Sequence, residues 1–171
     1  VVKNVLGDPA QIGQDGEIWV RGYLVMLGYY KDEAATQDAI TDDGWFKTGD
    51  LGRFDSEGYL QITGRAKEMF IVGGSNAYPA EIESYIETHP KVAQAVVCGA
   101  PHARLGEVCF AFVMPISDAS LKADEIIDFC RGNIADYKVP RHVRVMVDFP
   151  RTSTNKIQRF ILQKKVRDNF V

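Results

Sequence analysis

The sequence contains no long apolar run and no concentration of positive charge. None of its apolar stretches approaches the roughly 20 residues that a helix needs to cross a bilayer. Residues Val1 to Ile12 lack the basic start and the continuous apolar stretch of a signal peptide. The 20 Lys and Arg residues are balanced by 23 Asp and Glu residues and form no basic stripe. We therefore expect no membrane span and no nucleic-acid partner.

Cysteine and histidine are also scarce. Cys98, Cys109 and Cys130 show no CxxC spacing, leave one cysteine over, and each lies in an apolar segment. They are typical of small buried side chains in a reducing compartment, so we expect a cytoplasmic protein. The three histidines have no second ligand at a useful spacing, and we expect them to be structural and the chain to hold no metal.

The length and composition indicate a globular protein of limited size. The chain has 171 residues, of which 46% are hydrophobic and 25% charged, enough for one domain or for one small domain with part of another. It begins in the middle of a pattern, without Met and without a preceding element. We therefore expect it to be a fragment of a longer protein.

The first part of the chain, up to about Gly64, predicts antiparallel β structure. The run from Gly16 to Val20 alternates between polar and apolar residues, and Asp-Gly pairs mark turns. The Ala-rich and polar run from Lys31 to Ile40 predicts one short helix between the strands.

The second part of the chain predicts a small α+β domain. Its pattern indicates helices and strands in the order helix, strand, strand, helix, strand, helix, with a sheet of about three strands and flanking helices. The expected elements are a helix from Pro79, strands Ala93–Gly99 and Glu107–Met114, a helix from an N-cap near Ser120 to Ile134, a strand His142–Phe149 and a helix Arg159–Arg167.

A hinge is predicted between these parts, in the run from Gly58 to Glu83. The alternation over Tyr59–Ile62 breaks into the charged peptide Gly64–Glu68, which an apolar stretch and a Gly-Gly turn follow. Two ordered elements joined by a short, charged and flexible peptide are typical of a hinge between moving parts. The alternative is an exposed charged turn without such a role.

Two further motifs contain candidate functional residues. In GWFKTGDLG, Gly44 to Gly52, glycines flank Asp50, whose carboxylate could accept hydrogen bonds from the two hydroxyls of a ribose. In FPRTSTNKIQRF, Phe149 to Phe160, Lys156 lies between a strand and the last helix. The alternatives are a turn capped by a local Asp and an ordinary solvated Lys.

These three motifs, in this order, resemble those of the acyl-adenylate-forming superfamily, the AMP-dependent synthetases and ligases of the acyl-CoA synthetase type. Luciferases and the adenylation domains of peptide synthetases are also members. The resemblance extends over essentially the whole chain and implies the C-terminal part of such an enzyme. Residues 1–64 would be the end of the large domain, 65–67 the hinge, and 68–171 the mobile C-terminal α+β domain. The missing N-terminal domain would be its partner.

The resemblance also implies roles for individual residues in the first part and at the hinge. Asp50 corresponds to the aspartate that holds the ribose hydroxyls of ATP, and Arg65 contacts the ribose of the adenylate. Ile62 packs near the nucleoside. Lys67 occupies the position about which the C-terminal domain rotates between two catalytic poses.

In the second part the resemblance implies one catalytic residue and one position that contacts CoA. Lys156 corresponds to the lysine that catalyses adenylation, and Gly74 to a position that lines the pantetheine tunnel. The residue before this lysine is commonly Gly in the family and is Asn155 here. Asn tolerates left-handed backbone conformations better than most residues, so we expect the loop geometry to survive.

The function that follows from the resemblance is that of an ATP-dependent carboxylate-CoA ligase of fatty acid metabolism. It would use ATP, CoA, a small carboxylic acid and Mg, whose ligands would lie outside this chain, and the chain alone would be inactive. An adenylation domain of a peptide-synthetase-like enzyme is the alternative, although the chain ends at Val171 without a carrier domain. A free-standing, non-catalytic interaction module is the alternative from another class.

Overall fold

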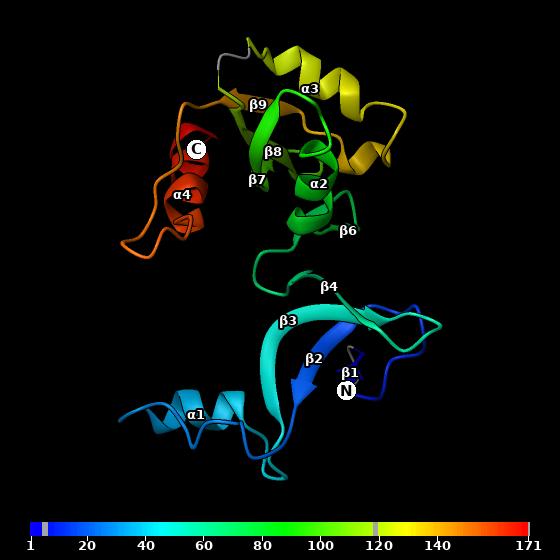
Figure 1. Cartoon of the computed structure of the whole chain (residues 1–171), viewed down its shortest axis with the longest axis vertical. Helices are drawn as coiled ribbons and strands as arrows, with labels where there is room; N and C mark the ends of the chain where they lie inside the picture. Colours follow the sequence, from blue (N-terminus) through cyan, green and yellow to red (C-terminus); the bar gives the residue numbers. More distant parts are fainter. Residues whose placement is uncertain (5–6, 118–119, 171) are drawn as a thin grey trace. The chain divides into compact units, whose positions relative to one another are not determined.

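The computed structural model describes residues 1–4, 7–117 and 120–170 and divides the chain into two compact units, Val1–Lys67 and Glu68–Val171 (Figure 1). Each unit has its own sheet. The assignment of 1–64, 65–67 and 68–171 to a large-domain remnant, a hinge and a mobile domain stays a prediction. Parts of those ranges, at 5–6, 118–119 and 171, lie outside the described residues.

The first unit is built on an antiparallel sheet, as its turn-rich, alternating sequence predicts. The strands lie in the order β1-β2-β3-β4, and a helix, α1, joins β2 to β3. Asp32 begins α1 as its N-cap, because its side chain accepts a hydrogen bond from the Ala35 amide. The elements are β1 Val2–Lys3, β2 Gly16–Val20, α1 Glu33–Ala39, β3 Phe46–Phe54 and β4 Leu60–Arg65.

In its described residues, the second unit combines a sheet with three α-helices and one 3-10 turn. β6, β5, β8 and β7 pair antiparallel in that order, and β9 pairs parallel to β8. β7 and β8 form its longest pairing (Figure 1). The elements are β5 Phe70–Val72, β6 Ser75–Ala77, α2 Pro79–Ile86, β7 Val92–His102, β8 Gly106–Pro115, α3 Ala123–Cys130, the 3-10 turn Asp136–Lys138, β9 His142–Val145 and α4 Arg159–Phe170.

Two apolar clusters fill the two faces of this second sheet. One cluster joins α2 and α3 to one face of β7 and β8, and the other joins α4 and the Phe149 side chain to the opposite face. Neighbouring residues of β7 divide between the clusters, with Val97 in the first and Val96 in the second. This is the alternation of a strand that is buried on both faces.

The structure confirms the α+β fold class and corrects some details. The second sheet has five strands rather than about three, because the apolar stretch before Gly73 forms the short strand β5 and the residues after Gly74 form β6. The N-cap predicted near Ser120 was wrong: α3 begins at Ala123, and its N-cap Lys122 makes no side-chain capping bond. Its last predicted apolar residue, Ile134, lies beyond the helix and packs against the first cluster.

Candidate functional site

Asp50 and Arg65 are brought together by the sheet of the first unit. Asp50 in β3 and Arg65 in β4 are register partners, and Arg65 Nε lies 2.8 Å from Asp50 Oδ1. The Asp50 side chain keeps 29% of its surface exposed, and the Arg65 side chain keeps 64%. A carboxylate and a guanidinium side by side on an accessible surface can accept from hydroxyl groups and donate to phosphate oxygens.

The backbone before Asp50 is fixed by polar contacts that the sequence analysis did not identify. Thr48 Oγ1 donates to the Ile18 carbonyl and accepts from the Asp50 amide, at 2.8 and 3.0 Å. Glu17 Oε1 accepts from the Gly49 amide at 3.1 Å. These bonds join β2 to residues 48–50, the segment that carries the Asp50 carboxylate. They therefore hold this carboxylate in a defined position although the described part of the first unit has no deep apolar core.

The other two candidates of the first unit are exposed. Ile62 lies in β4 with 67% of its surface accessible, and the register between β3 and β4 shifts next to it, between Leu51 and Gly52. Lys67 is an exposed residue of the turn after β4. The structure thus places Ile62 on the strand of Arg65 and Lys67 at the unit boundary, and their roles stay predictions.

Gly74 forms the tip of the β5–β6 hairpin with Gly73. Val72 and Ser75 are paired on either side of it, and the two glycines have φ of +56° and +90°. Positive φ at both central residues is what a tight type I′ hairpin requires. A Cβ built at Gly74 would meet open space, whereas one at Gly73 would lie 3.2 Å from Leu105. The backbone at Gly74 is therefore bare and accessible. A bare backbone is what a long, thin ligand requires in order to pass close to it.

Lys156 lies exposed on the loop between β9 and α4, as predicted. Thr152 brackets it: the Thr152 amide donates to the Lys156 carbonyl at 2.8 Å, and the Lys156 amide donates to Thr152 Oγ1 at 3.1 Å. Asn155 has φ of +64°, the left-handed conformation that Gly adopts most readily and Asn tolerates. The loop thus accommodates Asn at the position that is commonly Gly in the superfamily that the sequence resembles.

An ion pair between α2 and α4 was missed at the sequence level. Arg159 donates through Nη1 and Nη2 to both carboxylate oxygens of Glu83, at 2.6 and 2.7 Å. Glu83 is 7% exposed and also accepts from the Val97 amide. These hydrogen bonds raise the pKa of Arg159 above its ordinary value. The signal in the sequence is a Glu beside the apolar stripe of α2.

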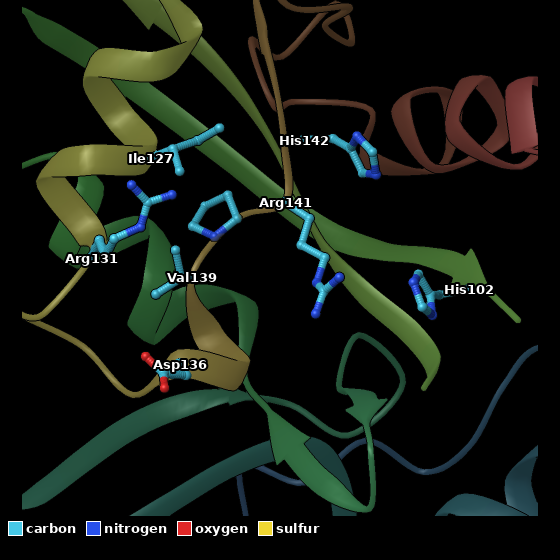
Figure 2. A pocket seen from close by; sticks show the side chains of 8 residues that line it. His102, Ile127, Arg131, Asp136, Val139, Arg141 and His142 are labelled. Atoms are coloured by element: carbon cyan, nitrogen blue, oxygen red, sulfur yellow. The ribbon is translucent and has the colours of Figure 1, made fainter. Parts of the chain in front are cut away.

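A pocket of about 650 Å³ lies in the second unit and contains none of the predicted site residues (Figure 2). Arg131, Arg141 and Asp136 line it, together with the two histidines His102 and His142. Burial, with the charge of Arg141, lowers the pKa of His142. The lining thus combines two arginines and one carboxylate with two histidines and three apolar residues.

The three cysteines are free and buried, as expected. Burial raises the pKa of Cys98 to about 12 and that of Cys130 to about 11, and it also raises the pKa of Cys109. These thiols are therefore packing groups rather than nucleophiles. Within 1–4, 7–117 and 120–170, no group of three or more His, Cys, Asp or Glu side chains is arranged to hold a metal ion.

No described helix is long and apolar enough to span a membrane. The helices of both units are short, and α4, the longest of those described, has 12 residues.

Residues 81–156 match the family model of the AMP-binding enzyme C-terminal domain. Relatives over nearly the whole chain agree with that match. YngI of Bacillus subtilis (strain 168), whose name assigns it to the acyl-CoA synthetases, is 46% identical over 94% of this chain. The mitochondrial medium-chain acyl-CoA ligase ACSF2 of Danio rerio is 42% identical over 96%.

A solved structure agrees with these relatives. ATP-bound MatB from Rhodopseudomonas palustris matches 100% of this chain with a TM-score of 0.92 and 36% identity. The chain therefore belongs to the acyl-adenylate-forming, or AMP-binding, superfamily, which includes the acyl-CoA ligases. It corresponds to the C-terminal part of these enzymes. It spans 29% of YngI, 27% of ACSF2 and 34% of MatB.

Proposed function

We propose that this chain is the C-terminal part of an ATP-dependent carboxylate-CoA ligase, which forms an acyl-AMP and then transfers the acyl group to CoA. The observation that carries the proposal is the loop of Lys156, an exposed ammonium on a backbone closed by its own hydrogen bonds. The names of the relatives, acyl-CoA synthetase and acyl-CoA ligase, favour CoA over a carrier-protein thiol as the acceptor.

In the first half-reaction, Asp50 would accept hydrogen bonds from the ribose hydroxyls of ATP, and Arg65 would contact the same ribose. Their 2.8 Å ion pair supports this role, because each side chain orients the other before the nucleotide binds. Ile62 would provide an apolar contact for the nucleoside. We assign no residue of this chain to Mg, whose ligands we expect in the rest of the enzyme.

Lys156 would act in the adenylation step itself. When a carboxylate attacks the α-phosphate of ATP, two anions approach each other and charge develops on the phosphate oxygens. An ammonium that contacts both groups stabilises this transition state by its charge and by the position it imposes. The proton stays on the Lys156 nitrogen throughout, pyrophosphate leaves, and acyl-AMP is the product.

In the second half-reaction, we propose that the second unit rotates about Lys67, withdraws Lys156 and presents the Gly73–Gly74 hairpin to the pantetheine of CoA. The bare backbone at Gly74 supports this role. The thiol sulfur would attack the acyl carbonyl carbon and lose its proton to solvent, and the bond between this carbon and the phosphate oxygen would break to release AMP. One site can thus catalyse two reactions in two poses.

The test uses the complete enzyme that contains this chain. Lys156→Ala should lower ATP-dependent acyl-AMP formation, measured by pyrophosphate exchange into ATP, roughly 10²–10³-fold. It should largely spare thioester formation from supplied acyl-AMP. Lys164→Ala, which changes another exposed lysine, is the matched control and should leave both rates unchanged. An equal loss in both half-reactions after Lys156→Ala would contradict the assigned role.

The hinge is tested separately by Lys67→Pro. Proline fixes one backbone dihedral, so it should hinder the rotation and slow thioester formation selectively, about 10-fold or more. The two half-reactions, measured as above, give the comparison. If adenylation falls as much as thioester formation, Lys67 is not the hinge.

The proposal includes a reducing compartment, for which the three free, buried thiols are the support. The cytoplasm stays our expectation, although one of the relatives, ACSF2, is named as mitochondrial. A place in fatty acid metabolism, as well as the inactivity of the isolated chain, likewise stays a prediction.

A further inference from the structure

We infer that Arg151, oriented by Gln94, is a positioning residue that sets the direction of the Lys156 ammonium for adenylation. The inference rests on the proposed function for its catalytic consequence. It adds Gln94, which lies on strand β7 and outside the loop, to the residues on which adenylation depends.

The backbone on both sides of Lys156 is held by side chains. Thr152 Oγ1 accepts from the Lys156 amide at 3.1 Å. On the other side, Arg151 Nη1 donates to the carbonyl of Asn155 at 3.3 Å. This carbonyl and the Lys156 amide belong to one peptide group, which is planar. Fixing both of its polar atoms fixes the orientation of the plane from which the Lys156 side chain starts.

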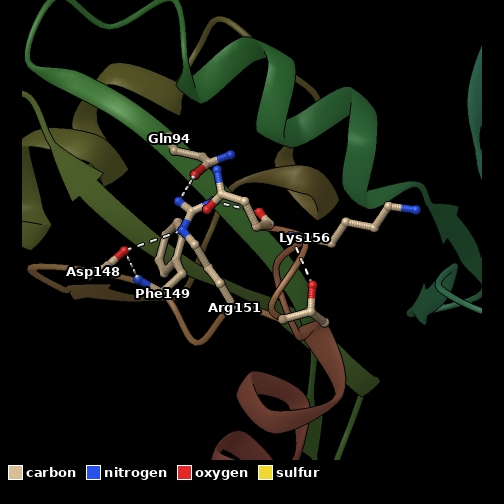
Figure 3. A network of polar contacts seen from close by, with 7 residues as sticks. Gln94, Asp148, Phe149, Arg151 and Lys156 are labelled. Carbon is tan, nitrogen blue, oxygen red and sulfur yellow. Dashed lines mark hydrogen bonds and ion pairs between the residues drawn. The ribbon is translucent and has the colours of Figure 1, made fainter.

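Arg151 itself is held by the packed part of the unit. Its Nη2 donates to Gln94 Oε1 on β7 at 2.7 Å, and its Nε lies 3.5 Å from Asp148 Oδ1. Figure 3 shows the guanidinium among these partners, whereas the Lys156 side chain extends away from them. The Arg151 side chain is 24% exposed and Gln94 is half-buried, so water competes only in part for these bonds.

The fork of the guanidinium is the property that this position uses. One nitrogen is directed at Gln94 on the sheet and another at the carbonyl that precedes Lys156, so a rigid planar group transmits the position of β7 to the loop. A Lys at this position keeps the charge but has a single, freely rotating ammonium, which does not reproduce that fork. Displacement of a catalytic group by about 1 Å can slow a reaction by about 10²-fold.

The catalytic test compares matched substitutions in the complete enzyme. Arg151→Lys should lower acyl-AMP formation about 10- to 100-fold and change thioester formation from supplied acyl-AMP less than about twofold. Gln94→Leu removes the acceptor of the Arg151 Nη2 hydrogen bond. It should also slow acyl-AMP formation selectively, but by a smaller factor. Gln94→Glu keeps an acceptor and should retain the wild-type rate, as should Arg144→Lys, a change at an exposed arginine of β9.

A second measurement does not depend on activity. Hydrogen exchange of the amides of residues 152–158 should be faster in Arg151→Lys and Gln94→Leu than in the wild type, and unchanged in Gln94→Glu. Unchanged exchange in Arg151→Lys overturns the inference, because Arg151 would then not hold the loop. Faster exchange together with equal loss in both half-reactions also overturns it, since the effect would be that of general loosening.

The test also separates this inference from the proposed function. If the wild-type enzyme forms acyl-AMP and Lys156→Ala does not, the proposed role of Lys156 stands whatever Arg151→Lys shows. In the Lys156→Ala background, Arg151→Lys should cause no further loss of the residual adenylation. An additional loss of the full size would show that Arg151 acts on its own and not through Lys156, and would overturn the inference.

Discussion

The two units stabilise their candidate sites in different ways. Among the described residues of the first unit, the only buried apolar side chains are Val2 and Ile18, whereas Tyr23, Leu24 and Leu27 are at least 84% exposed. The second unit has apolar clusters on both faces of its sheet. The first unit places Asp50 by polar contacts between neighbouring strands, while the second places the Lys156 loop by side chains anchored on a packed core.

This difference has consequences for stability. Burial of apolar surface contributes most of the free energy of folding, and segments with little of it open at low free-energy cost. We therefore expect the first unit of the isolated chain to unfold more easily than the second. The chain contains a separate probe for each unit, because both tryptophans, Trp19 and Trp45, lie in the first and all three cysteines in the second.

The largest expected effect is on the core of the second unit. Leu162 in α4 is fully buried, so Leu162→Ala should lower the free energy of unfolding of the second unit by about 3 kcal/mol. Urea titrations of the isolated chain measure this by thiol labelling, and tryptophan fluorescence should show an unchanged transition in the first unit.

Tyr23→Ala is the matched control, because Tyr23 is 97% exposed. It should change the free energy of unfolding of either unit by less than about 0.5 kcal/mol. If Leu162→Ala shifts the tryptophan and thiol transitions equally, the two units unfold together and the contrast between them is wrong.

The next effect concerns the polar site of the first unit. Asp50→Ala in the complete enzyme removes the partner of Arg65 and should raise KM for ATP about 10-fold, the equivalent of a hydrogen bond to a charged group. The urea transition of the second unit, read by thiol labelling of the isolated chain, should not change. Asp42→Ala, at an exposed turn residue of the same unit, should leave KM unaltered; an equal rise there would indicate a general effect of charge.

The smallest effect is expected from pH on the buried thiols. Their raised pKa, about 12 for Cys98 and about 11 for Cys130, means that raising the pH to 9 ionises at most about 1% of them, whereas an exposed cysteine with a pKa of about 8.5 is mostly ionised. Labelling of the folded chain should therefore stay slow at pH 9. A thiol that reacts as fast as a small-molecule thiol would show that the core of the second unit opens readily.

Much of the fold could be predicted because the responsible signals are local. Pro79 begins α2 as predicted, and α4 begins at Arg159. The end of α3 could not be predicted as well, since the apolar spacing continues to Ile134 although the helix ends at Cys130. A residue that packs on the core after the helix leaves the same pattern as one within it.

The candidate site shows the same division. The Gly73–Gly74 turn and the left-handed Asn155 follow from residue types whose backbone preferences are intrinsic. The contacts of Arg151 with Gln94 and of Arg159 with Glu83 join residues 57 and 76 positions apart. No local pattern encodes such partners.

The sequence by itself thus determined the α+β class, the family and the positions of Asp50, Arg65 and Lys156 in their motifs. These properties depend on periodicity, turn residues and short motifs, which act over a few residues along the chain. Only the tertiary structure decided that Asp50 faces Arg65 and that the Lys156 loop is held from β7 through Arg151. The physical reason is that the partner of a polar side chain is selected by strand register and by the packing of distant elements, which bring together groups that the sequence separates.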